Sequence, residues 1–289
     1  MMYGGADMRF GNDTAEFLVP DSKSAEEALA RTTHMGIGAH ADDLEIMAYH
    51  GILECFMNDN KWFLGVTITD GAGSPRDNFY ASCTDEEMRK VRRAEQKKAA
   101  VIGEYSGVVL LDYPSPAVKD PKNPMVREDI KKLISLARPS CLYTHNLADK
   151  HDTHVSVAVR VIQVLRELPR EVQPQKVYGC EVWRDLDWMV DEDKVVFDVG
   201  AHENLATALT GVFDSQICGG KRYDLATMGR RRANATYFEA HGTDITSAMI
   251  YAMDLTPLTR DPKLDVAEYA IGHIARFSRE VSARLKRVL

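Results

Sequence analysis

Short apolar runs alternate along the chain with segments whose apolar residues recur at helical spacing. Six of these runs have the length and composition of strands, and helical patterns fall between most of them. This alternation predicts an α/β fold with a mostly parallel sheet and helices on both faces. The expected strands are Met35–Ala39, Phe63–Thr69, Val108–Leu111, Cys141–Thr144, Val177–Val182 and Val195–Val199.

One expected helix, residues 85–102, has clear signals at both ends. Thr84 and Glu87 have the spacing of a capping box, and Gly103 can end the helix. The residues from His241 onward are expected to be helical as well. We therefore predict a single domain over residues 1–289, with a core of about 30–200 and a helical C-terminal portion of about 201–289. The other expected helices are Leu44–Asn58, Arg127–Ala137, Thr153–Leu168, Asn204–Phe213 and Tyr223–Glu239.

Composition excludes several classes of protein. An apolar fraction of 45 % and a charged fraction of 27 % in 289 residues are typical of a globular domain. The net charge of -7 gives no reason to expect a nucleic-acid partner. No apolar run approaches the roughly 18–20 residues of a membrane span, and the N-terminus lacks the pattern of a secretory signal. Five scattered cysteines indicate reduced thiols, so we expect a cytoplasmic protein.

The first candidate site follows the first expected strand, where His40, Asp42 and Asp43 precede a helix. In open α/β sheets, sites form beyond the carboxyl ends of the strands. Imidazole and carboxylate groups are ligands for zinc. Two adjacent carboxylates cannot easily reach one ion from a tight turn, so we expect Asp43 to bind a metal and Asp42 to act as general base. The alternative is that one aspartate only caps the helix and His40 is incidental.

The second candidate site follows the expected strand Cys141–Thr144. His151 and His154 lie three residues apart at the start of a helix, which places both on one side of it. One of them can complete a set of two histidines and one carboxylate, which leaves an open position for water as in catalytic zinc sites. The alternative is a pair of surface histidines. His145 lies closer to the strand, and we expect it to support the ligands.

Both sites resemble the zinc-dependent N-deacetylases related to LmbE and to the enzyme that deacetylates N-acetylglucosaminyl phosphatidylinositol (the PIG-L family). Residues 39–45 read Ala-His-Ala-Asp-Asp-Leu-Glu, close to the family's Ala-His-Pro-Asp-Asp-x-Glu. Residues 151–154 read His-Asp-Thr-His, where the family has His-Pro-Asp-His. Thr-Asp-Gly at 69–71 and Arg-Arg-Ala-Glu at 92–95 match weaker family segments. The resemblance covers about the first 170 residues.

The resemblance implies a Rossmann-like fold and a role for each motif residue. It implies that His40, Asp43 and His154 bind Zn²⁺ (or another divalent metal such as Fe²⁺). It also implies that Asp42 is the base and that His151 stabilises the oxyanion. Arg92 would bind the substrate, although a surface ion pair with Glu95 is an alternative. The implied reaction removes the N-acetyl group from a small amide such as an N-acetylated amino sugar or its conjugate. We expect a small-molecule substrate and a homo-oligomer.

Three other functions stay open at this point. The same metal chemistry would serve an amidase that acts on a different acyl group or on a thiol conjugate. A metal-containing binding protein without catalysis would have no need of Asp42. An iron-dependent oxygenase also uses two histidines and one carboxylate, although such enzymes mostly have other folds.

Overall fold

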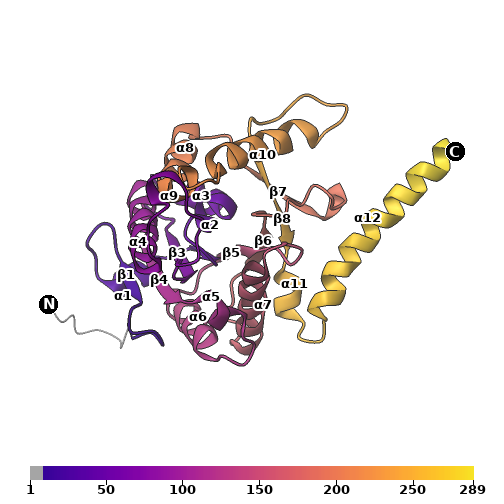
Figure 1. Ribbon diagram of the computed structural model, residues 1–289. Coiled ribbons are helices and arrows are strands. Elements are labelled where there is room, and N and C mark those ends of the chain that lie inside the picture. The colour runs from indigo at the N-terminus through magenta and orange to yellow at the C-terminus, as the bar shows by residue number, and fades with distance from the viewer. Residues whose placement is uncertain (1–8) are drawn as a thin grey trace.

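The computed structural model describes residues 9–289, and Figure 1 shows their arrangement. These residues form one eight-stranded sheet between helical layers. The five central strands run parallel to one another, and an antiparallel strand pairs with each side of this group. Their order in the sheet is β1 (Glu16–Leu18), β4 (Gly107–Tyr113), β3 (Phe63–Thr69), β2 (His34–Gly38), β5 (Cys141–His145), β6 (Lys176–Cys180), β8 (Met249–Asp254) and β7 (Lys194–Asp198).

Two hydrophobic cores cover the two faces of the sheet. Successive residues of one strand point to opposite faces, and along β4 and β8 the buried residues alternate between the two cores. One core packs against α1 (Ala25–Ala30), α5 (Ser115–Lys119), α6 (Met125–Ala137), α7 (Asp152–Glu167) and α11 (Thr256–Arg260). The other packs against α2 (Asp43–Met47), α3 (Tyr49–Cys55), α4 (Asp85–Ile102) and α8 (Glu203–Gly211). The remaining elements are η1 (Asn78–Tyr80), η2 (Asp191–Asp193), α9 (Asp214–Ile217), α10 (Tyr223–Tyr237) and α12 (Val266–Val288).

Two glycines of β2 let α2 lie directly on the sheet. A Cβ atom on Gly36 would come within 2.7 Å of the Phe63 ring and 3.0 Å of the Leu44 side chain. A Cβ atom on Gly38 would come within 3.0 Å of the Asp43 Cβ. The missing side chains therefore bring the start of α2 against the carboxyl end of β2, where the first candidate site lies.

Helix α4 has the predicted bounds and the predicted capping box. Its inward face differs from the expectation. The charge of Glu95 suggested an outward position, but Glu95 is buried. Arg92 and Gln96 are buried beside it. This polar face is turned toward the first candidate site, and its groups find partners there, as described below.

The mostly parallel α/β fold is confirmed, and three local expectations are wrong. Residues from His241 onward are not all helical, because Met249–Asp254 forms β8 between β6 and β7. A six-residue run that is buried on both faces has no periodicity that separates a strand from a buried helix. The expected helix Leu44–Asn58 is two helices, which meet at Ala48, where φ is -102°. The three-residue edge strand β1 was not expected.

The C-terminal helix α12 confirms the expected helical extension. Figure 1 shows it beside the sheet, with its C-terminal half clear of the body. The single-domain organisation remains a prediction, which the pairing of β8 with β6 supports. Within residues 9–289, no helix combines the length and the apolarity that a membrane-spanning segment requires.

Candidate metal centre

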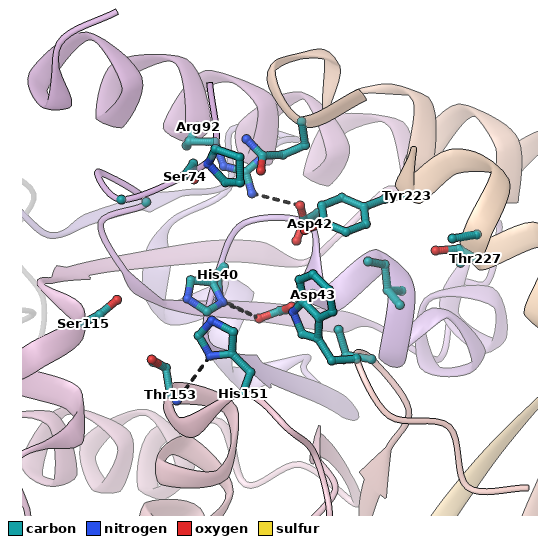
Figure 2. Close-up of a pocket in the computed structure, with 18 of the residues that line it drawn as sticks. His40, Asp42, Asp43, Ser74, Arg92, Ser115, His151, Thr153, Tyr223 and Thr227 are labelled. Carbon is teal, nitrogen blue, oxygen red and sulfur yellow. Dashed lines mark hydrogen bonds and ion pairs between the residues drawn. The ribbon is translucent and has the colours of Figure 1, made fainter. Parts of the chain in front are cut away.

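The turn after β2 directs two neighbouring carboxylates to different partners. The backbone N–H of His40 donates to Oδ2 of Asp43 at 2.6 Å, whereas Asp42 faces Arg92 (Figure 2). Asp42 has a φ of +87°, a left-handed conformation that is rare outside glycine and clusters at functional sites. The Asp42 side chain makes no capping hydrogen bond to α2. Helix capping therefore does not account for Asp42.

Gln96 of α4 holds this turn in place. Its Oε1 atom accepts the backbone N–H of Asp42 at 3.2 Å, and its Nε2 donates to Oε1 of Glu45 at 2.8 Å. Tyr105 donates to the same Glu45 oxygen at 2.7 Å. All three side chains are buried. Their hydrogen bonds therefore hold the backbone of Asp42 in its left-handed conformation.

The second segment reaches the same point from the neighbouring strand. Strand β5 pairs with β2 in parallel, so their carboxyl ends lie side by side. His151 is the N-cap of α7, and His154 lies in its first turn. The Nε2 atom of His154 lies 3.1 Å from Nδ1 of His40 and 3.4 Å from Oδ2 of Asp43. The two predicted sites therefore form one cluster.

The separations within this cluster fit one metal ion. His40 Nδ1 lies 3.4 Å from Asp43 Oδ2, so the three atoms form a triangle with sides of 3.1–3.4 Å. Ligand bonds of about 2.0–2.1 Å at tetrahedral angles place ligand atoms about 3.3–3.4 Å apart. The donor set of two imidazoles and one carboxylate is the one that divalent metals bind in open sites.

The protonation states of the cluster also suit a metal. Burial lowers the pKa of His154 to about 4, so its imidazole is neutral at neutral pH. Burial opposes the charge on Asp43, but the neighbouring His154 and His145 hold the pKa of Asp43 well below its usual range. Neutral imidazole and ionised carboxylate are the forms that ligate.

His145 lies behind the cluster. It is fully buried and stacks on His154 with a ring separation of 3.9 Å. Its Nε2 atom accepts the backbone N–H of Ala39 at 2.9 Å. This nitrogen also lies 3.4 Å from Asp43 Oδ2. Its lone pair already accepts the hydrogen bond from Ala39 and is not free for a metal ion. His145 therefore ties β5 to the end of β2 and packs His154 in place.

Asp42 is held by a buried arginine on the other side of the cluster. The Nη2 atom of Arg92 donates to Asp42 Oδ2 at 2.9 Å and also to the Ala41 carbonyl. Its Nη1 donates to Glu95 at 3.2 Å. The ion pair with Glu95 thus forms, but inside the protein rather than on its surface. Burial raises the pKa of Asp42 to about 6 against the opposing charge of Arg92, a value that suits a proton acceptor near neutral pH.

His151 presents a proton donor to the same space. Its Nδ1 atom accepts the backbone N–H of Thr153 at 3.3 Å, so the neutral ring carries its proton on Nε2. The ring lies edge-on to His40, 4.9 Å between centroids. Burial and the nearby His40 lower the pKa of His151. His151 therefore lies beside the cluster of His40, Asp43 and His154.

Asp149 supports both histidines of the second segment, and no sequence motif includes it. Its Oδ1 accepts the backbone N–H of His151 at 2.9 Å and lies 3.6 Å from Nδ1 of His154. Its Oδ2 accepts the backbone N–H of Trp183 at 3.1 Å. A carboxylate behind a ligand histidine fixes the ring and raises its basicity. Asp149 is an ordinary loop aspartate until the fold places it there.

A pocket of about 540 Å³ opens above the cluster (Figure 2). The loop after β3 lines it through Gly71, Gly73, Ser74 and Pro75, and the region after residue 200 adds residues of α10. Trp183 and Tyr223 form an aromatic wall with their rings edge-to-face at 5.9 Å. The sequence motifs include neither aromatic residue, because both come from segments without a recognisable pattern. All six predicted site residues lie at this pocket or directly beneath it: His40, Asp42, Asp43, Arg92, His151 and His154.

One family profile matches the segment that contains both motifs. Residues 35–165 match the family described as PIG-L, GlcNAc-PI de-N-acetylase. The matched segment begins in β2 and ends near the end of α7, so it includes every residue of the metal cluster. A search of curated proteins finds no match.

Three solved structures share the fold. The hydratase GalB from Pseudomonas putida KT2440, which acts on 4-carboxy-2-hydroxymuconate, is 15 % identical with a TM-score of 0.58, over 78 % of this chain and 97 % of that one. N,N'-diacetylchitobiose deacetylase from Pyrococcus horikoshii is 16 % identical with a TM-score of 0.58, over 80 % and 88 %. The zinc-inhibited form of teicoplanin deacetylase Orf2 is 12 % identical with a TM-score of 0.55, over 77 % and 98 %.

Proposed function

We propose that this chain, whose residues 35–165 match the PIG-L family, is a metal-dependent N-deacetylase of a small amide. One observation carries the proposal. The ligand atoms of His40, Asp43 and His154 lie within 3.1–3.4 Å of one another at the base of a pocket. The carboxylate of Asp42 lines the same pocket, as a hydrolytic reaction needs.

The metal would be held by His40, Asp43 and His154. A divalent ion bound there supplies a Lewis acid that polarises the amide carbonyl and makes water more acidic. We propose Zn²⁺, because the donor set and its spacing suit zinc. Fe²⁺ is the alternative, since it accepts the same donors. One protein with this fold, teicoplanin deacetylase Orf2, has a zinc-inhibited form. Any assay therefore has to control the amount of zinc.

Asp42 would act as the general base. Arg92 fixes one of its oxygens, and the raised pKa of about 6 leaves the carboxylate ionised yet able to accept a proton at neutral pH. It takes the proton from water as the water oxygen attacks the amide carbon. His151 would donate its Nε2–H to the oxygen that gains negative charge. One such donor is typically worth about 3–4 kcal/mol in the transition state.

The reaction then needs a proton on the leaving nitrogen. Asp42 holds the proton it received from water and can pass it to the amine as the C–N bond breaks. Asp42 returns to its ionised state, and the second proton of the attacking water leaves the new carboxyl group and is taken up by the amine. The products are therefore acetate and the protonated amine, and both protons of the water are accounted for.

The substrate we propose is an N-acetylated amino sugar or its conjugate. A pocket of about 540 Å³ accepts a ligand of one to two sugar rings. Trp183 and Tyr223 offer an apolar wall on which a sugar ring can stack. The deacetylases with this fold act on a chitobiose derivative and on teicoplanin, which supports an acetylated sugar conjugate. A different acyl group or a thiol conjugate would use the same metal chemistry.

The cytoplasm is the location we propose. Cys55, Cys83, Cys141, Cys180 and Cys218 are all unpaired in the structure. Unpaired thiols in a protein of this size are typical of a reducing compartment.

Metal reconstitution joined to an acetate-release assay tests the proposal. The apoprotein is loaded with Zn²⁺, Fe²⁺, Co²⁺ or Ni²⁺ at controlled stoichiometry and incubated with acetylated amino sugars. We expect release of equal amounts of acetate and amine with at least one metal. A matched Asp42→Asn protein is the control for contaminating activity. A metal-loaded wild type that releases no acyl group from any amide, but adds water to an unsaturated acid or consumes oxygen, would contradict the deacetylase proposal.

A further inference from the structure

Helix α12 exposes an apolar stripe along its whole length. The stripe consists of Ile271, Ile274, Val281, Leu285 and Val288, whose side chains are between 40 % and 77 % exposed. In the part of the chain that the structure describes, no residue of this helix is buried. Contiguous exposed apolar surface of this kind normally marks a contact surface.

The stripe is not the face by which α12 contacts the body. Tyr269 donates to the Asp254 carbonyl at 2.7 Å. His273 and Arg276 both contact the carboxylate of Asp193, at 3.0 and 2.5 Å. At 100° per residue, these three residues lie more than a quarter turn from the centre of the stripe. The contacts fix the direction of α12 and leave the apolar stripe in solvent.

The spacing of the stripe points to another helix as its occupant. From Ile271 onward the positions are 271, 274, 278, 281, 285 and 288, so the steps alternate between three and four residues. Only Ser278 interrupts the apolar series. This alternation is the repeat by which two helices pack along a common seam. A flat lipid surface requires a broad apolar face but no such repeat.

The charges around α12 favour a second copy of the same helix in the opposite direction. The C-terminal end carries Arg284, Lys286 and Arg287. The opposite end carries Asp265 and Glu268, and the carboxylate of Asp193 contacts the helix further along, at His273 and Arg276. A parallel pair would bring the basic ends together. An antiparallel pair brings each basic end to the acidic end of the other copy.

We propose that α12 forms an antiparallel helix pair with α12 of a second copy of this chain, with residues 271–288 as the seam. The pair has two-fold symmetry, so the same stripe serves both protomers. The two pockets remain open, since α12 contributes no residue to the pocket lining. This proposal is independent of the deacetylase activity.

Sedimentation equilibrium of the full chain tests the pair. We expect a dimer at micromolar concentration. The double variant Ile274→Glu/Val281→Glu places charges in the seam and should raise the dissociation constant by at least ~100-fold. Ala283→Glu is the matched control, because Ala283 is an exposed residue of α12 outside the stripe, and it should leave the dimer intact. Unchanged circular dichroism shows that each variant is folded.

Charge reversal at the basic end tests the direction of the pair. Arg284→Glu/Lys286→Glu/Arg287→Glu should weaken an antiparallel dimer, because attraction to the acidic end becomes repulsion. In a parallel dimer the triple variant would replace repulsion between two basic ends by repulsion between two acidic ends. The dissociation constant would then stay the same, and that result would overturn the antiparallel arrangement. Two further results overturn the proposal: a wild-type monomer at every concentration, and a monomer that binds phosphatidylcholine/phosphatidylserine vesicles through the same stripe.

Discussion

His40 and His154 are separated by 114 residues along the chain, yet their facing ring nitrogens lie 3.1 Å apart. Two lone pairs at this distance repel unless a proton or a cation lies between them. Asp43, 3.4 Å from both nitrogens, adds a negative charge to the same point. A shared proton or a divalent cation removes this repulsion, and the donor set makes the cation the species that we propose.

Replacing His154 by alanine should abolish metal binding. The variant loses one of three ligands, and the remaining two cannot hold a divalent ion against competition from buffer and water. Elemental analysis of the purified variant should find almost no metal, whereas His273→Ala, which changes a histidine of α12, should retain it. Full metal content in His154→Ala would remove this residue from the ligand set.

Replacing Asp42 by asparagine should separate metal binding from turnover. Asparagine has the same shape and can still accept a hydrogen bond from Arg92, but it cannot take a proton. We expect normal metal content and a fall in kcat of about 100- to 10,000-fold. Near-normal turnover of the metal-loaded variant would show that another group is the base.

Arg92→Lys distinguishes two roles for this arginine. Lysine keeps the charge but cannot contact Asp42, the Ala41 carbonyl and Glu95 together. If Arg92 mainly positions Asp42, kcat should fall by ~10- to 100-fold with little change in KM. A rise in KM at nearly constant kcat would instead support the substrate-binding role that the family resemblance implies.

Asp149→Asn should weaken metal binding without removing a ligand. Asp149 lies 3.6 Å from Nδ1 of His154, and the loss of its charge makes that imidazole a poorer donor. We expect the metal dissociation constant, measured by competition with a chelator, to rise by ~10- to 100-fold. Asp152→Asn, at the exposed start of α7, is the control. Equal affinities for wild type and Asp149→Asn would show that Asp149 only anchors the loop.

His34 should make the protein less stable as the pH falls from 6.5 to 4. Burial lowers its pKa from 6.5 to about 4, so in this range the unfolded chain binds a proton that the folded protein does not. The stabilising effect of the neutral form is therefore present above pH 6.5 and declines below it. Between pH 7 and pH 5 the free energy of unfolding should fall by about 2 kcal/mol from this group alone.

Urea unfolding of His34→Gln at the two pH values measures this contribution. Whatever the absolute stability of the variant, its loss of unfolding free energy between pH 7 and pH 5 should be smaller than that of the wild type by about 2 kcal/mol. His241→Gln, at an exposed position, should lose as much as the wild type. The same pH dependence in His34→Gln and wild type would disprove the assignment.

The sequence predicted the centre of the molecule better than its periphery. Strand β3 and helix α4 have the expected bounds, because both have strong patterns and clear end signals. His40 and His154 could be placed together since each follows a strand, and strand ends of a parallel sheet meet at one edge. The motif residues indicated the chemistry, and the parallel sheet indicated that the two motifs lie close together.

The rest depended on tertiary contacts that no local pattern encodes. Strand β8 is buried on both faces and therefore has no alternation of polar and apolar residues. Glu95 lies on the inward face of α4, where an apolar residue would be expected. It can be buried there because Arg92 and Ser215 provide hydrogen-bond partners inside the protein. Asp149 and Trp183 acquire their roles only when the loop after β5 meets the segment after β6.

The place of β8 in the sheet also has a consequence for biosynthesis. A ribosome releases β7 long before β8, yet β8 is the strand that joins β7 to the sheet. Until residue 254 has emerged, the outer edge of β6 has no neighbour, and an open strand edge is a template for aggregation. The residues of the proposed metal site therefore emerge early in synthesis, whereas the edge of β6 is covered late. Any truncation before Met249 removes β8 and leaves β7 without its partner strand.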